Sequence, residues 1–155
     1  MENKNYNLEK FDLAVLNREA TWWEMELPSG SVLFGDVKTE MLGYNEADFK
    51  NYEDFTKLIH PEDYERVMQD MRDHLSGKKE LYETKYRIRK KNGEYMSFYD
   101  CGEIISREDG KIKLIGFVWK INENIDIEKQ MKDFREIILR GQPSIIDLFA
   151  KVKSA

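Results

Sequence analysis

Apolar and polar residues alternate most regularly between residues 81 and 121, and this period of two predicts β-strands. Two dipeptides, Asn92-Gly93 and Asp109-Gly110, divide the stretch into three runs. Both favour tight hairpin turns, because type I′ turns need a positive φ at both central positions. The pattern therefore predicts an antiparallel meander whose strands cover Leu81–Lys91, Glu94–Ser106 and Lys111–Ile121.

The first and last strands of this meander differ in the number of apolar faces. In the first strand, uncharged residues alternate with charged ones, so the uncharged face is expected to be covered and the charged face to be exposed to solvent. The last strand is apolar on both faces, so we expect short helices on one side and the N-terminal helix or a partner subunit on the other. Its two apolar sets are Ile112, Leu114 and Val118, and Ile115, Phe117, Trp119 and Ile121.

Short apolar clusters before the meander predict a series of small elements. A longer amphipathic helix follows them; it begins at Pro61, which suits a first helical position, and Gly77 ends it. The small elements are too short to be stable alone, so packing must hold them. They are strands over Thr21–Leu27 and Ser31–Phe34, and helices over Val37–Leu42, Glu46–Lys50 and Tyr52–Leu58.

Amphipathic helices are also predicted on both flanks. The N-terminal segment, residues 1–18, has a helical apolar pattern over Leu8–Arg18. The C-terminal extension, residues 123–155, begins with apolar residues in an a/d pattern that suits a dimer or docking seam. Gly141 and Pro143 end that helix, and Ile145–Lys153 forms another. The seam consists of Ile127, Met131, Phe134 and Ile138.

The composition narrows the class of protein. With 155 residues, 41% of them hydrophobic, the chain can build one globular core. Its formal net charge of −5 argues against a nucleic-acid partner, and no apolar run approaches the ~20 residues of a membrane span. A single cysteine, Cys101, cannot form an internal disulfide, which fits a reducing compartment. We therefore expect a cytoplasmic protein.

Several short motifs mark the predicted elements. The early ones are Thr21-Trp22-Trp23-Glu24, Met41-Leu42-Gly43-Tyr44 and Ile59-His60-Pro61-Glu62-Asp63. The later ones are Tyr86-Arg87-Ile88-Arg89, Lys91-Asn92-Gly93-Glu94-Tyr95, Glu108-Asp109-Gly110-Lys111 and Leu114-Ile115-Gly116. In this order and spacing they resemble the PAS sensor domain, in the subgroup common in bacterial and archaeal signalling proteins. The resemblance covers roughly Glu19–Ile127, and we expect the PAS domain itself over residues 19–122.

The resemblance implies an α+β fold: a five-stranded antiparallel sheet with short helices on one face, plus N- and C-terminal flanking helices. Such domains enclose a pocket that holds a cofactor, a metabolite or only side chains, and their flanking helices dimerise and pass a signal on. Two positions depart from the family pattern. Lys120-Ile121-Asn122-Glu123 replaces an Asp-Ile-Thr-Glu-like closing motif, and Ser97 stands where a tryptophan is frequent.

The pocket is expected between the meander and the helix that follows His60. Aromatic and methionine side chains from these elements would line it, since small-molecule pockets are mostly apolar with a few polar groups. The same aromatic residues could equally form a plain core. The ligand-pocket candidates are Met41, Phe55, Met71, Tyr86, Phe98 and Phe117.

Other polar residues are weaker candidates for chemistry. His60 with Glu62 and Asp63 could bind a metal, but a helix-start role explains it better, and we expect no metal site. His74 lies near the helix end and at the edge of its apolar stripe, where a partly solvated histidine is favoured over a haem ligand. Cys101 lacks the Asn-Cys-Arg-Phe motif of flavin-binding relatives, so a buried thiol is favoured. The cofactor is unknown, with haem and flavin both disfavoured.

The sequence favours a sensory PAS domain of a signal-transduction protein, such as a two-component system. It would bind a small ligand or a partner and signal through dimerising flanking helices, as a homodimer with a signalling output protein. No catalytic signature is present, so we expect no enzyme, but a fragment of or partner to a histidine kinase or similar output enzyme. The alternative is a ligand-free dimerisation or interaction module. Less favoured is a metal-dependent enzyme using His60 and Asp63.

Overall fold

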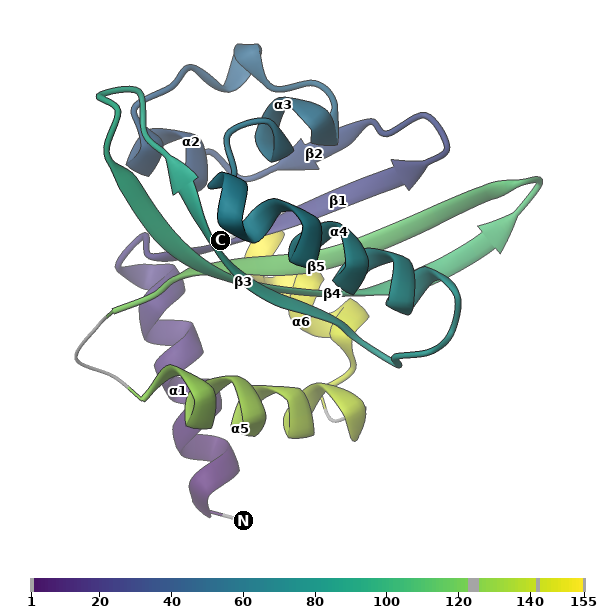
Figure 1. Cartoon of the computed structure of the whole chain (residues 1–155). Helices are drawn as coiled ribbons and strands as arrows, with labels where there is room; N and C mark the ends of the chain where they lie inside the picture. The colour runs from purple at the N-terminus through teal and green to yellow at the C-terminus, as the bar shows by residue number, and fades with distance from the viewer. Residues whose placement is uncertain (1, 123–125, 142, 155) are drawn as a thin grey trace.

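A computed structural model describes residues 2–122, 126–141 and 143–154, with the backbone alone described at 2–7 and 137. Five antiparallel strands form one sheet in the order β2-β1-β5-β4-β3 (Figure 1). The α+β fold class expected from the sequence is confirmed. The strands are β1 (Ala20–Leu27), β2 (Val32–Phe34), β3 (Tyr82–Arg89), β4 (Tyr95–Glu108) and β5 (Lys111–Lys120).

Helices cover both faces of this sheet. The short helices and α4 lie on one face, which we call the inner face, while α1, α5 and α6 lie on the opposite, outer face (Figure 1). No helix among the described residues is long and apolar enough to cross a membrane. The helices are α1 (Glu2–Leu16), α2 (Val37–Leu42), η1 (Glu46–Asp48), α3 (Tyr52–Thr56), α4 (Pro61–Leu75), α5 (Ile127–Leu139) and α6 (Ile145–Lys153).

The two hairpin turns of the meander differ. At Asp109 and Gly110 both φ angles are positive, at 54° and 74°, as a type I′ turn requires. At the other turn only Gly93 has a positive φ, so the expectation of a second type I′ turn is wrong. There the Lys90 N–H donates to the Glu94 carbonyl at 2.7 Å, which closes a longer loop.

The central strand β5 is covered on both faces, as its two-sided pattern predicts. Leu114 and Val118 face inward, while Phe117 and Trp119 face outward. β1 pairs with β5 along its whole length, with Ala20 opposite Trp119. The outer cover comes from the chain's own α1, α5 and α6, with Phe11 of α1 5.1 Å from both the Phe117 and Trp119 rings.

The C-terminal seam packs on the chain's own sheet. Met131, Phe134 and Ile138 are buried in the outer-face cluster, and Ile127 packs against its edge. Of the two roles expected for this stripe, a dimer seam or a docking seam, the packing within the chain is a docking seam, and pairing with a second copy stays a prediction. A 3.5-residue apolar repeat indicates that one side of a helix is buried, but it does not indicate which surface covers that side.

Two smaller differences concern helix ends, and one expected motif cannot be followed to its last residue. Helix α1 begins at Glu2, six residues before the predicted start, and its described apolar contacts are made by Leu8, Phe11, Ala14 and Val15. Asp36 does not cap α2 with its side chain; instead, Arg18 donates to Asp36 at 3.1 Å and to Glu40. Glu123, the last residue of the unusual closing motif, lies outside the described residues.

Candidate functional site

A cavity of about 290 Å³ lies between the inner face of the sheet and helices α2, α3 and α4. Its volume is near the lower end of the range for small-molecule sites. All five strands contribute lining residues besides the helices, β1 the most. The lining is mostly apolar and includes Met25, Phe34, Phe55, Met71, Ile88 and Val118.

Trp23 forms part of the cavity wall because two glycines make room for its ring. A Cβ atom added at Gly102 would lie 2.5 Å from the Trp23 ring, and one at Gly116 would lie 2.4 Å from it. Side chains at these positions of β4 and β5 would therefore push the indole away from the sheet. The Trp23 Nε1–H also donates to Asp100 Oδ1 at 2.5 Å, which fixes the ring's orientation.

Three cavity-lining residues, Lys38, Tyr86 and Asp100, are linked by hydrogen bonds that join two buried charged groups. We call this set the buried charged chain. Lys38 comes from α2, while Tyr86 and Asp100 come from inward positions of the neighbouring strands β3 and β4. The Lys38 ammonium donates to the Tyr86 hydroxyl at 2.5 Å, and this hydroxyl donates to Asp100 Oδ2 at 3.1 Å. The Tyr86 hydroxyl therefore links a cation and an anion that form no direct ion pair with each other.

Burial changes the proton affinity of both charged groups. Loss of water lowers the pKa of Lys38 to about 8, and the Asp100 charge only partly offsets this effect. Burial raises the pKa of Asp100 to about 6, opposed by Lys38 and by the hydrogen bonds from Trp23 and Tyr86. At neutral pH both groups are therefore mostly charged, and both are near enough to titration to respond to a change in the cavity.

Aromatic rings surround the Lys38 ammonium. Its Nζ lies 4.7 Å from the ring centroid of Phe55, 5.0 Å from that of Tyr86 and 5.6 Å from that of Phe98. Ring faces attract a cation at such distances, most strongly where water is excluded. This aromatic cage partly compensates for the water that the ammonium loses on burial.

The structure separates the six ligand-pocket candidates into three groups. Phe55, Met71 and Tyr86 line the cavity. Met41 and Phe98 belong to the same inner-face cluster but do not line it. Phe117 is on the outer face, packed against Phe11 and Phe134, so its predicted position is corrected. The cause is strand alternation, because neighbours along β5 point to opposite faces of the sheet.

Two residues of the buried charged chain, Lys38 and Asp100, were missed by the sequence analysis. Asp100 did carry a signal, because it falls in phase with the inward Phe98 on a strand whose pattern is otherwise buried. An acidic residue at an inward strand position needs a buried partner. Lys38 carried no comparable signal, since lysine is among the residues most often exposed on short helices.

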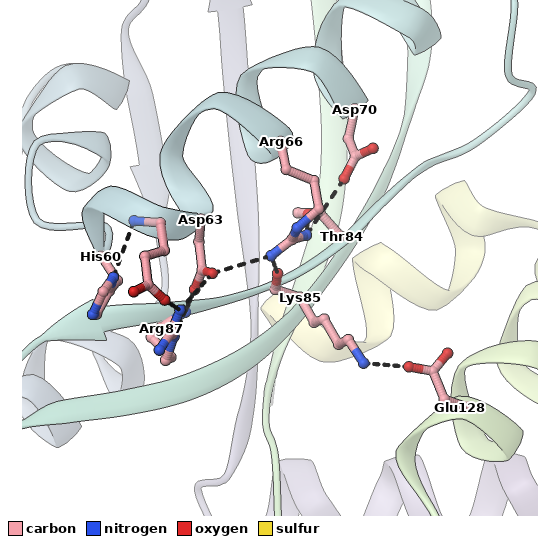
Figure 2. Close-up of polar contacts among 9 residues, drawn as sticks. His60, Asp63, Arg66, Asp70, Thr84, Lys85, Arg87 and Glu128 are labelled. Atoms are coloured by element: carbon pink, nitrogen blue, oxygen red, sulfur yellow. Dashed lines mark hydrogen bonds and ion pairs between the residues drawn. The ribbon is translucent and has the colours of Figure 1, made fainter.

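The corner at His60 and Asp63 is held by contacts within the chain. The Glu62 N–H donates to His60 Nδ1 at 3.1 Å, which begins α4. The Asp63 carboxylate accepts from the Arg87 side chain at 2.9 and 3.0 Å and from the Arg87 N–H at 2.9 Å, as Figure 2 shows. These bonds lower the pKa of Asp63 to about 2. The His60 side chain thus caps α4 and Asp63 fastens α4 to β3. No metal-binding cluster is found among the described residues.

His74 is buried rather than partly solvated, which corrects the expectation from the sequence. Its Nδ1 lies 3.0 Å from the Lys79 carbonyl, and the Ile104 N–H donates to its Nε2 at 3.2 Å. The register of β4 against β5 shifts directly after Ile104, between Ile104 and Ser106. His74 therefore satisfies a backbone group at this irregularity, and it does not line the cavity.

We expect His74 to make stability depend on pH. Burial lowers its pKa below the usual value of about 6.5, so the unfolded chain binds the proton more tightly. Stability is then fully present above pH 6.5 and falls as the pH drops below it. Urea unfolding at pH 7 and at pH 5.5 should show a smaller pH-dependent loss in His74→Gln than in the wild type. Equal losses in the two proteins would contradict this role.

Cys101 lies on the outer face, opposite Phe117 across the β4–β5 pair. Its side chain is buried, and burial raises the pKa of the thiol. It does not line the cavity. The thiol therefore packs as a small apolar group, away from any ligand in the cavity.

Comparisons with known proteins agree with this geometry. A family model described as PAS fold matches residues 35–118. A similar solved structure is a sensory box histidine kinase/response regulator from Burkholderia thailandensis, with 23% identity and a TM-score of 0.60 over 82% of this chain and 95% of that one. Among the curated proteins, none matches the sequence.

Two further structures share the fold. One is the N-terminal domain of a diguanylate cyclase with PAS/PAC sensor from Marinobacter aquaeolei, with 25% identity and a TM-score of 0.58, covering 65% of this chain and 94% of that one. The other is a PAS domain from Colwellia psychrerythraea, with 15% identity and a TM-score of 0.54, covering 74% and 96%.

Proposed function

This chain belongs to the PAS fold family, whose model matches more than half of its residues, and on that premise we propose that it is a sensory domain of a signal-transduction protein. In this proposal the cavity binds a small ligand, and helix α5 carries the signal. The domain acts by binding rather than by catalysis. The names of the similar structures, a histidine kinase and a diguanylate cyclase, support an output of that kind.

The observation that carries the proposal is the buried charged chain beside an apolar cavity. Burying an ammonium and a carboxylate costs free energy, and apolar residues of similar size often stabilise a core as well or better. Such groups cluster at functional sites because their pKa values respond to what binds nearby. Lys38 and Asp100 are therefore better explained by recognition than by stability.

Strand β3 provides the route from the cavity to α5. On one side it holds α4 through the Asp63–Arg87 bonds and through Arg66, which donates to the Thr84 hydroxyl at 3.0 Å and to the Lys85 carbonyl at 2.6 Å (Figure 2). On the other side its outward residues hold α5, with Lys85 paired to Glu128 and Glu83 to Arg135. A movement of α4 over a ligand would thus reach α5 through one strand.

We further propose that α5 has two packings. In one it lies on the outer face, as described above. In the other it leaves the sheet, and its apolar stripe pairs with that of a second copy. A ligand would shift the balance between the two only to the extent that it binds one better than the other. In this proposal the protein forms a homodimer only when α5 has left the sheet.

The test is a thermal-shift screen of small metabolites, followed by hydrogen exchange of α5 with and without each hit. A ligand at 100 times its Kd should stabilise the folded state by about 2.7 kcal/mol. Met71→Trp, which fills the cavity, should abolish the shift. Tyr64→Trp, on the exposed side of the same helix, should preserve it.

The outcomes separate the proposed functions. A ligand that stabilises the wild type and Tyr64→Trp but not Met71→Trp, and that alters exchange in α5, supports a sensor. Stabilisation without any change in α5 would contradict the proposed route. No stabilisation by any compound would favour the ligand-free interaction module.

A further inference from the structure

We propose that the cavity ligand is a small monocarboxylate with an apolar body, and that its carboxylate binds the Lys38 ammonium. This inference rests on the proposed sensory function and adds the chemical class of the ligand. Three features of the cavity carry it: the free donors of Lys38, the occupied aromatic cage, and the distribution of charge along the lining.

The first feature is the unused hydrogen-bonding capacity of Lys38. An ammonium has three N–H donors, and Lys38 uses one on Tyr86. Among the described residues it makes no other hydrogen bond and no direct ion pair. The Lys38 side chain is buried and lines the cavity, where an acceptor is worth more than in bulk water. A carboxylate can accept from the remaining donors of Lys38 and also supply the missing direct counter-charge.

The second feature is that the cavity is already closed to a cationic head group. The aromatic cage of Phe55, Tyr86 and Phe98 would suit a ligand ammonium, but the protein's own Lys38 occupies it. The one carboxylate in the lining, Asp100, has a donor on each oxygen, Trp23 on one and Tyr86 on the other. A ligand cation would therefore be repelled by the Lys38 ammonium and would find both oxygens of Asp100 already hydrogen-bonded to protein donors.

The third feature limits the ligand to one carboxylate. The other cation in the lining, Arg72, donates to Glu65 at 2.6 Å and to Gln69 at 2.9 and 3.2 Å. It is thus paired on the surface of α4 and does not offer a second anion site. The rest of the lining is chiefly apolar, with the flexible side chains of Met25, Met68 and Met71 able to follow an irregular shape.

The volume limits the size of the ligand. The cavity of about 290 Å³ corresponds to the liquid volume of about ten water molecules. An aryl or short alkyl group fits this space, whereas a nucleotide or a large cofactor would require the helices to open. Benzoate, phenylacetate and hexanoate are suitable probes of the class.

The experiment is isothermal titration of the full chain with each acid and with its primary amide, which has nearly the same shape but no charge. The wild type should bind the best acid roughly 10- to 100-fold more tightly than its amide, as expected for a hydrogen bond to a charged group. Lys38→Met, which keeps the apolar stem, should remove this preference. Met71→Ala should weaken acid and amide alike and keep the preference.

A second variant keeps the test valid if Lys38→Met fails to fold because Asp100 is left without compensation. Lys38→Met combined with Asp100→Asn removes both charges and should likewise bind acid and amide equally. If the amides bind as well as the acids to the wild type, the carboxylate class is wrong while the sensory function stands. If no probe binds but the metabolite screen finds a ligand of another class, the inference is also overturned. If neither experiment finds a ligand, both proposals fail.

Discussion

Replacing Phe134 with alanine is expected to lower the free energy of unfolding by about 3–5 kcal/mol, the usual cost of deleting a buried aromatic ring. The side chain is 1% exposed. Its ring centroid lies 5.0 Å from that of Phe11, 6.2 Å from that of Phe117 and 5.8 Å from that of Trp119. The variant removes the contact that joins α5 to both α1 and β5. Urea unfolding followed by circular dichroism measures the loss.

The matched control on the same helix is Leu139→Ala. Leu139 is 45% exposed, so its loss should change stability by no more than about 0.5 kcal/mol. The loss in Phe134→Ala should be independent of protein concentration, because the contacts lie within one chain. A loss that shrinks with rising concentration would instead place Phe134 in an interface between two copies.

Replacing Asp100 with alanine is expected to cost about 3–5 kcal/mol, because it leaves the Lys38 ammonium buried without a carboxylate nearby. It also removes the acceptor of the Trp23 indole and the Tyr86 hydroxyl. Adding Lys38→Met to this variant should recover roughly half or more of the loss, since no uncompensated charge remains. Urea unfolding of the wild type, the two single variants and the double variant provides the complete cycle.

The control for this cycle is Glu108→Ala, at the exposed end of the same strand, which should change stability by no more than about 0.5 kcal/mol. Equal stabilities of Asp100→Ala and its Lys38→Met double would contradict the coupling. If the double variant is as stable as the wild type but no longer prefers acids to amides, stability and recognition are separated. The buried charges would then be retained for binding.

The sequence predicted the parts of the fold that local patterns determine. The period-two runs after residue 80 identified the meander, and Asp109-Gly110 identified its second turn, because these signals need no knowledge of distant contacts. Residues 145–153 were predicted with the correct helix bounds for the same reason. The Asn92-Gly93 turn shows the limit, since that dipeptide also suits a longer loop that places a positive φ only on the glycine.

The partner of an apolar stripe could not be predicted in the same way. The spacing of Met131, Phe134 and Ile138 describes which side of a helix is apolar, and a sheet of the same chain satisfies it as well as a second copy does. The misplacement of Phe117 has a related cause. An apolar residue on a strand with two buried faces is equally suited to either face, so only register against β4 decides which core it joins.

The buried charges show a different limit. The relay from Lys38 to Asp100 depends on an α2 turn and a β4 strand that are 62 positions apart, brought together across the strand that carries Tyr86. Local signals do not identify such a pair, because Lys38 alone resembles an ordinary surface residue, and the inward phase of Asp100 predicts a buried partner without showing which residue it is. The pair becomes visible only when the inner face of the sheet is assembled.

The pairing of β1 with β5 also has a consequence for how the chain folds. β1 lies between β2, its neighbour in the sequence, and β5. Ala20 therefore pairs with Trp119, which is distant in the sequence. Contacts between distant residues form slowly, because a long loop must close before they contribute free energy. We therefore expect β3, β4 and β5 to assemble first as consecutive hairpins and β1 to join them late. Pulsed hydrogen exchange during refolding would record that order, with amides of β4 protected before those of β1.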